Sequence, residues 1–336
     1  MTNRNQTGRA GRVVRYDGSP DQSDALRAIA MDAFHLDTYS DPGAIRDRLD
    51  LNCHRVWLIS AEKDLPAAGF LATFPTDSLA GRRVEFDLLA VRSDVQGKGL
   101  AGRLMQSALA EWRSSGATPA RALIRQENGA STRVFQRAGF APAEWKGELL
   151  IGQAVAGEVS LTQDSLTVRL VDERDLSDLR QNWPSIFLED RIVGWDSIPP
   201  KESEHIASFP QKRKSSIAGD SLSSPPLSLL QRDDFGLLVA TDSSGILGFA
   251  ELLVVHTIPY SGVWVEHLEA IDDDPDVMLV LTEAARRWAA GRGLGQAGAV
   301  IDLAREAVRS RLRDAGYHSA GVYRHFHRPA MDGELS

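Results

Sequence analysis

Residues 91–105 read VRSDVQGKGLAGRLM, and this stretch decides the fold that we expect. Three glycines separate an apolar run that ends at Val91 from a helical pattern of leucines that begins at Leu100. Glycines between a strand and a helix let a phosphate approach the unpaired amides at the helix N-terminus, where the helix dipole also attracts it. Lys98 and Arg103 add positive charge. The stretch predicts an anion site, and a plain glycine-rich turn is the alternative reading.

Length and composition indicate a globular protein of about two domains. The chain has 336 residues, of which 43% are hydrophobic and 25% charged, and its net charge is −8. The acidity argues against a general nucleic-acid binder, and the absence of a run of about 18 apolar residues argues against a membrane protein. The only cysteine is Cys53, which excludes an intramolecular disulfide and a cysteine cluster for zinc. We therefore expect a cytoplasmic protein without a metal site.

An internal repeat is visible in three short sequence words. Gly69-Phe70 recurs as Gly248-Phe249, Trp112 recurs as Trp288, and the word AGF at 138–140 recurs as AGY at 315–317. The offsets are 248−69 = 179, 288−112 = 176 and 316−139 = 177 residues. Such constancy predicts two copies of one fold.

The order of elements can be predicted for both copies. In the first copy we expect strands at 12–16, 54–60, 67–74, 82–91 and 121–125, and helices that start near residue 20, at residue 100 and near residue 129. We expect a flexible N-terminus at 1–11, a first domain at 12–152, a linker at 153–165 and a second domain at 166–330. A polar insert at about 199–232 interrupts the second domain.

Two motifs resemble those of the GCN5-related N-acetyltransferases, the GNAT superfamily. Residues 96–101, QGKGLA, match the superfamily's pyrophosphate loop Q/R-x-x-G-x-G/A, and residues 128–140, NGASTRVFQRAGF, resemble its later motif, in which an asparagine begins a helix that ends in Gly-Phe. Neither stretch fits a Walker A loop or a dinucleotide fingerprint. The sequence is thus identified as a GNAT protein of the tandem, two-domain type.

The resemblance implies the fold and the cofactor site. The fold would be mixed α/β, with two tandem units that are each a mixed, mostly antiparallel twisted sheet with helices on both faces. The first sheet would splay between its fourth and fifth strands, and acetyl-CoA would lie in that cleft. The backbone at Leu89, Ala90 and Val91 would pair with the pantetheine. The other cofactor-binding residues would be Gln96, Gly97, Lys98, Gly99, Leu100, Ala101, Gly102 and Asn128.

The chemistry requires a base, because only a neutral amine attacks a thioester and an alkylammonium has a pKa near 10. Glu85 lies 96−85 = 11 residues before Gln96, the placement of the catalytic glutamate in relatives that use one. Asp87 shares its strand face and could contact the substrate ammonium. Alternatively, one or both carboxylates are paired with arginines such as Arg82 or Arg125, or line an open cleft.

Three further features bear on function. The slot of the tyrosine that protonates the leaving thiolate in many relatives holds Phe135, so water or another residue would supply that proton. His325 and His327 alternate on a terminal strand without a third metal ligand. In the second copy, residues 271–278 read IDDDPDVM, so the glycines are replaced by aspartates that suit helix capping and repel a phosphate. We expect that this copy binds no acetyl-CoA, although Glu266 and Glu269 could contact a cationic acceptor.

Together the motifs and the candidate base predict an acyltransferase. We expect an acetyl-CoA-dependent N-acetyltransferase that transfers acetyl to a primary amine of a small molecule by direct attack in a ternary complex. The alternatives are acetylation of a peptide or protein amine and a non-catalytic acetyl-CoA sensor or scaffold. We expect no nucleic-acid or membrane partner, and a homodimer stays open.

Overall fold

The structure, a computed structural model, describes residues 11–34, 54–62, 66–79, 81–114, 119–163, 165–183, 227–257 and 260–329. Residues 1–10 of the expected flexible N-terminus and most of the expected insert lie outside the described residues.

The first half of the chain follows the predicted order of elements closely. Its helices start where the sequence indicated, and each strand boundary lies within a few residues of its prediction. The elements are β1 (Val13–Arg15), α1 (Pro20–Phe34), β2 (Arg55–Ser60), β3 (Ala67–Ser78), β4 (Gly81–Val91), a 3₁₀ turn η1 (Ser93–Val95), α3 (Leu100–Ser114), β5 (Ala120–Arg125), α4 (Gly129–Arg137), β6 (Ala141–Pro142) and β7 (Gly147–Gln153).

The second half repeats this order. The segment 153–165, which was expected to be a linker, includes a short edge strand. The elements are β8 (Leu161–Gln163), β9 (Leu166–Leu170), α5 (Asp175–Asn182), α7 (Leu227–Leu230), β10 (Phe235–Asp242), β11 (Gly245–His256), β12 (Ser261–Ala270), η3 (Ile271–Asp273), α8 (Pro275–Gly291), β13 (Gln296–Asp302), α9 (Glu306–Asp314) and β14 (His318–Arg328).

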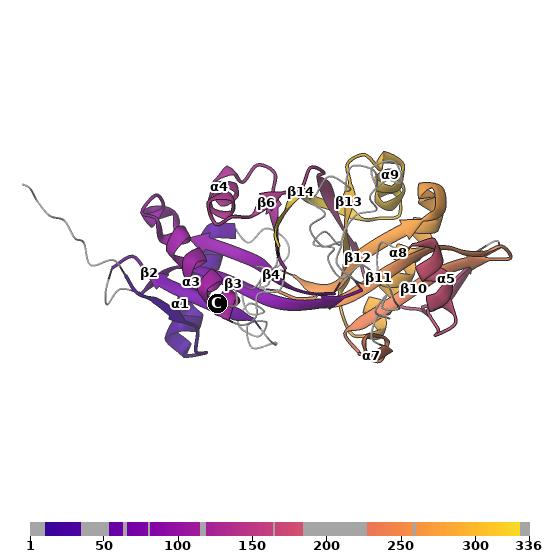
Figure 1. The fold of residues 1–336 in the computed structure, drawn as a ribbon, viewed down its shortest axis with the longest axis horizontal. Coiled ribbons are helices and arrows are strands. Elements are labelled where there is room, and N and C mark those ends of the chain that lie inside the picture. The colour runs from indigo at the N-terminus through magenta and orange to yellow at the C-terminus, as the bar shows by residue number, and fades with distance from the viewer. Residues whose placement is uncertain are drawn as a thin grey trace, which may run out of the picture.

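All strands join one mixed, 14-stranded sheet that runs through both halves (Figure 1). The order is β1-β2-β3-β4-β5-β14-β7-β13-β12-β11-β10-β9-β8, and β6 pairs with β14. Most neighbours are antiparallel, whereas β4 and β5, and likewise β12 and β13, are parallel. The expectation of two tandem units with mixed, mostly antiparallel sheets is confirmed.

The two halves exchange their last strands. β14, from the end of the chain, pairs with β5 of the first half over Tyr323–Arg328, and β7 of the first half pairs with β13 of the second half over its whole length. β14 and β7 also pair with each other. The sheet of each half therefore ends on a strand from the other half, so a division of the sequence near residues 152 and 166 does not divide the sheet.

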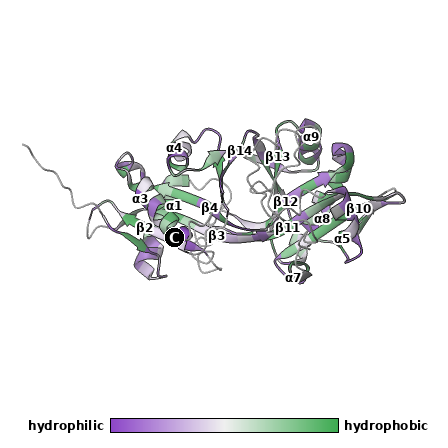
Figure 2. Cartoon of the chain, in the orientation of Figure 1, coloured by the Kyte–Doolittle hydropathy of each residue, from purple (hydrophilic) through white to green (hydrophobic). Residues whose placement is uncertain are grey.

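Apolar clusters on both faces of the sheet hold the helices. In the first half, α3 packs its buried face, which includes Leu104, Met105 and Trp112, against β2 to β5, while α1 covers the opposite face through Leu26 and Ile29. α8 packs in the same way in the second half. A further cluster spans the junction and includes Leu79 and Trp264. Figure 2 shows hydrophobic colour on strands within each half, such as β2 and β12.

A glycine with a left-handed backbone at the end of a helix explains why the AGF word recurs as AGY. Gly139 follows the last turn of α4 with φ +83°, and Gly316 follows α9 with φ +88°. A left-handed residue after a helix end is the usual place for glycine, because other residues are strained there. At Gly139 a Cβ atom would also clash with Nη1 of Arg328 on the exchanged strand β14.

Candidate active site

The site forms where β4 and β5 separate. These parallel strands pair only at Val84↔Ala120 and Glu85↔Arg121, and among the described residues nothing pairs with that edge of β4 between Phe86 and Val91. The expected splay between the fourth and fifth strands is therefore present. β12 and β13 separate in the same way after Val265↔Ala299.

The glycine loop leaves its backbone open. Gly97 and Gly99 have φ +78° and +77°, and a Cβ atom at Gly97, Gly99 or Gly102 would meet nothing within 4 Å. α3 begins at Leu100, so its first amides have no intrahelical partner and point toward this open space. The loop has the geometry of the anion site that the sequence predicted, and binding of a pyrophosphate there remains a prediction.

The corresponding loop of the second half is closed by its own carboxylates. Asp274 caps α8, and its Oδ1 accepts hydrogen bonds from the amides of Asp276 and Val277 at 2.8 and 3.3 Å. Asp273 lies 2.8 Å from Nη2 of Arg305. Of the three aspartates expected to suit capping, Asp274 has that role, and the two amides that it binds already have an acceptor.

A β-bulge marks the middle of β4. Ala72 pairs with Leu88 and Thr73 pairs with Phe86, so Asp87 is an extra residue without a partner on β3. The second half has the same irregularity at Glu266, since Glu251 pairs with His267 and Leu252 pairs with Val265. The two bulged residues are 266−87 = 179 residues apart, the offset of the Gly-Phe words. Bulges re-aim side chains and are common next to active sites.

Glu85 lies in a buried cluster of four charged side chains. Its Oε1 is 2.6 Å from Nε of Arg83 and 2.7 Å from Nη2 of Arg121, and its Oε2 accepts a bond of 3.0 Å from Nε of Arg121. The same two arginines contact Glu266 of the second half at 2.7 and 2.9 Å. The exposed fractions are 9% for Glu85, 3% for Arg83, 2% for Arg121 and 1% for Glu266.

The cluster fixes the charge state of Glu85. Burial by itself raises the pKa of its carboxyl, but attraction to Arg121 and then Arg83, together with their hydrogen bonds, outweighs burial and lowers the pKa overall. The sequence had offered Arg82 or Arg125 as partners, and that detail was wrong. Arg83 shares the strand face of Glu85 by alternation, and Arg121 lies opposite it in the parallel register.

Asp87 has the opposite environment. Its Oδ2 atom is buried and has no hydrogen-bond partner among the described residues. Burial, followed by repulsion from Glu85, raises the pKa of Asp87 to about 8. The structure thus brings the two predicted carboxylates together but gives them different states near neutral pH, with Glu85 ionised and paired and Asp87 close to its titration midpoint.

The remaining predicted cofactor residues lie around the split. Leu89 and Val91 point toward the α3 side of the sheet, and Ala90 points toward α1. Gln96 donates from Nε2 to the carbonyl of Val91 at 3.1 Å. Asn128 caps α4 and accepts from the amide of Ser131 at 3.0 Å, which leaves its NH₂ group available as a donor.

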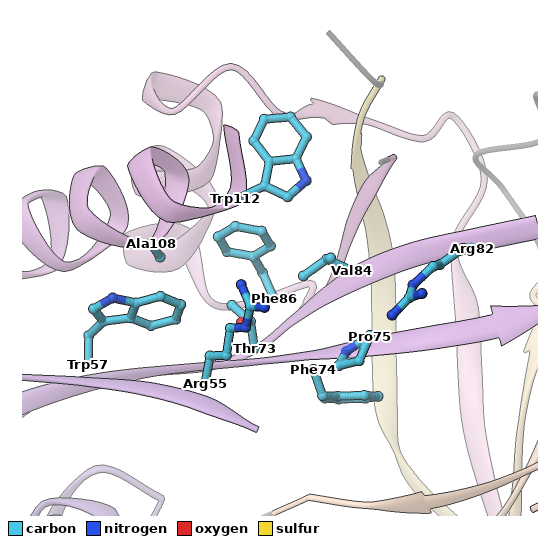
Figure 3. A pocket seen from close by; sticks show the side chains of 10 residues that line it. All are labelled: Arg55, Trp57, Thr73, Phe74, Pro75, Arg82, Val84, Phe86, Ala108 and Trp112. Carbon is cyan, nitrogen blue, oxygen red and sulfur yellow. The ribbon is translucent and has the colours of Figure 1, made fainter. Parts of the chain in front are cut away.

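Phe135 belongs to an aromatic cluster that offers no proton. Its ring lies 5.1 Å from that of Phe140 and 6.4 Å from that of Phe86, with edge-to-face geometry. A pocket of about 260 Å³ lies on the same face of the sheet, between β4 and the end of α3 (Figure 3). Figure 3 shows Phe86 and Trp112 projecting into it from opposite sides. Val84 and Phe86 line this pocket, so by alternation Glu85 faces away from it.

Three charged residues of the cluster were not predicted as site residues. Arg83 could have been found from strand alternation alone. Arg121 requires the parallel register of β4 and β5, and the contact of Glu266 requires the arrangement of the two halves. From the sequence we considered that Glu266 could contact a cationic acceptor. In the structure its carboxylate contacts Arg83 and Arg121 instead.

Comparison with known proteins gives the family. Residues 23–140 match the acetyltransferase (GNAT) family. The match covers most of the first half, which is therefore similar to the GNAT acetyltransferases. A search of curated proteins found no match. Among the described residues, no helix is long and apolar enough to cross a membrane.

Solved structures share the fold over nearly the whole chain. A GCN5-related N-acetyltransferase from Sphaerobacter thermophilus is 15% identical with a TM-score of 0.53, and the alignment covers 96% of this chain and 98% of that one. The GCN5-related glucosamine N-acetyltransferase region of a fungal multi-domain β-N-acetylglucosaminidase is 14% identical with a TM-score of 0.56. That alignment covers 96% of this chain but only 38% of the fungal one. These likenesses extend the GNAT fold to the second half.

Proposed function

We propose that the first half binds acetyl-CoA along the glycine loop and the β4–β5 split, and transfers its acetyl group to a primary amine of a small molecule. The observation that carries this proposal is the position of Asp87. It lies at the bulge of β4, where the two strands separate, and its Oδ2 atom is buried without a hydrogen-bond partner among the described residues. The unpaired edge of β4 from Phe86 to Val91 would accept the pantetheine as an additional strand.

The reaction is a direct attack in a ternary complex. A base takes one proton from the substrate ammonium, and the neutral amine attacks the thioester carbonyl carbon. The C–N bond forms, the C–S bond breaks, and the CoA thiolate leaves. A carboxylate with a pKa of about 8 is a better acceptor for an ammonium proton than an ordinary aspartate, because its pKa lies closer to that of the amine.

The contacts favour Asp87 over Glu85 as the base. Both oxygens of Glu85 accept hydrogen bonds from arginines that hold its carboxylate in the ionised state, so its proton affinity is low. In this proposal Glu85 acts through Asp87, because its charge raises the proton affinity of its neighbour. Phe135 cannot protonate the thiolate, and water is the donor that the proposal requires.

The acceptor can be identified with a panel of amines. Purified protein with acetyl-CoA should release CoA thiol in the presence of amino sugars, amino acids or diamines, and mass spectrometry should show the product heavier by one acetyl group. Glucosamine belongs in the panel because the fungal neighbour is named for it. Turnover only with peptides would favour the peptide alternative. Binding of acetyl-CoA without turnover on either class would favour a sensor.

The glycine loop can be tested without straining the fold. Gly99 has a positive φ, so any substitution there is strained, whereas Gly102 lies inside α3 in open space. A carboxylate in the first turn suits the helix dipole, so Gly102→Glu should fold, and it should repel the pyrophosphate and weaken acetyl-CoA binding by about 100-fold. Gln106→Glu, one turn further along the exposed face, is the matched control. Equal calorimetric affinity for the two variants would refute the loop assignment.

A further inference from the structure

Glu266 occupies the position in the second half that Asp87 has in the first. Both are the extra residue of a bulge, and both follow the last paired residues of the parallel strands. The carboxylate of Glu266 is used differently, because it reaches the first half. Its Oε1 lies 2.7 Å from Nη2 of Arg83 and 2.9 Å from Nη1 of Arg121, and its Oε2 accepts from Nη2 of Arg121 at 3.1 Å.

The cluster is specific to this junction between the halves. The equivalent positions of the second half carry no such charges. Gly262 takes the place of Arg83, and Trp264 takes the place of Glu85. On the neighbouring parallel strand, Gly298 takes the place of Arg121. The second half therefore lacks the two cations and the other carboxylate, and its only contribution to the cluster is Glu266. With two guanidinium groups and two carboxylates, the complete cluster is neutral.

The charged groups around Asp87 can be named by element. Glu85, two residues away on β4, is the charged group whose repulsion acts on Asp87. The other charges of the cluster surround Glu85: Arg83 of β4 and Arg121 of β5 contact it, and Glu266 of β12 contacts both arginines. His267, next to Glu266, pairs with Glu251 of β11. The buried residues of α1 are Ser23, Leu26, Ile29 and Ala30, none of which carries a charge. β14 adds two histidines, His325 and His327, whose pKa values are lowered by burial and, for His325, also by the positive charges of Arg121 and Arg83.

We propose that Glu266 is a positioning residue for the first half's reaction, which balances the charge of Arg83 and Arg121 so that Asp87 stays a strong proton acceptor. This inference rests on the proposed function of Asp87. Without the carboxylate of Glu266, the two arginines would face Glu85 alone, and the cluster would carry one net positive charge next to Asp87. A positive charge stabilises the ionised aspartate and weakens it as a base.

The sign of the effect provides the test. Glu266→Gln keeps the shape of the side chain and should move the titration of Asp87 down by about one pH unit, as expected when the buried cluster that contains Glu85 loses one negative charge. Arg83→Gln leaves the cluster with one net negative charge and should move it up. Glu269→Gln is the matched control, because Glu269 is a buried carboxylate on the same strand that pairs with Arg305 inside the second half.

Two readouts separate this inference from the proposed function. The first is the pH at which kcat/KM falls on the acid side, which should shift by as much as the titration midpoint of Asp87. The second is ¹³C NMR of labelled aspartate, in which the Asp87 signal is assigned by its loss in Asp87→Asn. It should show the same shift of the Asp87 midpoint in protein without substrate. Absence of transfer with a normal NMR shift would refute the proposed function alone. An Asp87 midpoint that is unchanged in Glu266→Gln, or that moves in the same direction in Arg83→Gln, would overturn the role of Glu266.

Discussion

Asp87→Asn is expected to lower kcat by roughly 10²- to 10⁴-fold while the affinity for acetyl-CoA stays nearly constant. The amide cannot accept the substrate proton, and the side chain keeps its size, so the split between β4 and β5 should stay open. Steady-state kinetics with a reactive amine and calorimetry with acetyl-CoA measure the two effects. Raising the pH should partly restore turnover, because the amine then loses its proton to solvent.

The same substitution should stabilise the protein at high pH. The folded-state pKa of Asp87 is raised to about 8, so the ionised form is disfavoured in the fold, and stability is lost as the pH rises from the unfolded pKa through the folded one. Asn stays neutral, and urea unfolding at pH 9 should show a gain that shrinks toward pH 5. Glu85→Gln should show no such gain. Full turnover of Asp87→Asn across the pH range would show that Asp87 is not the base.

Arg121→Met should have the largest effect on stability. The substitution leaves Glu85 and Glu266 with Arg83 as their shared cation, so one negative charge is buried without compensation. Removal of one partner from a buried ion pair typically costs about 3–5 kcal/mol of unfolding free energy. Chemical denaturation of the whole chain measures the loss.

Arg82→Met is the matched control for that substitution. Arg82 lies on the neighbouring position of β4, its side chain is 65% exposed, and its only ion pair in the described part of the chain is a contact of 3.7 Å with Asp77. Its replacement should change the unfolding free energy by no more than about 0.5 kcal/mol. A loss of less than about 1 kcal/mol for Arg121→Met would show that the cluster is solvated and would weaken the account of Glu85.

Local patterns predicted most of the fold. The three glycines, the asparagine that caps α4 and the left-handed Gly139 each impose a local geometry, so their meaning could be read without tertiary structure. The repeat followed from the same kind of signal. The sequence places Asp87 two residues after Glu85 on one strand, but it could not show the bulge that interrupts alternation there, because a bulge depends on the register with β3.

Two features could not be read from the sequence because they depend on long-range pairing. β14 occupies the place in its repeat that β6 and β7 occupy in theirs, so the pattern alone does not say which of these strands pairs with β5. The partners of Glu85 depend on the same arrangement, since one of its arginines lies on another strand and Glu266 lies 181 residues away by 266−85. The different states of the two carboxylates follow from those contacts.

The stoichiometry of acetyl-CoA binding tests the central claim most directly. The glycine loop of the first half is open, whereas Asp274 closes the corresponding loop of the second half. Calorimetric titration of the whole chain should therefore give one acetyl-CoA per chain, and Gly102→Glu should weaken that site by about 100-fold. A stoichiometry of two, or an unchanged affinity in Gly102→Glu, would contradict the account.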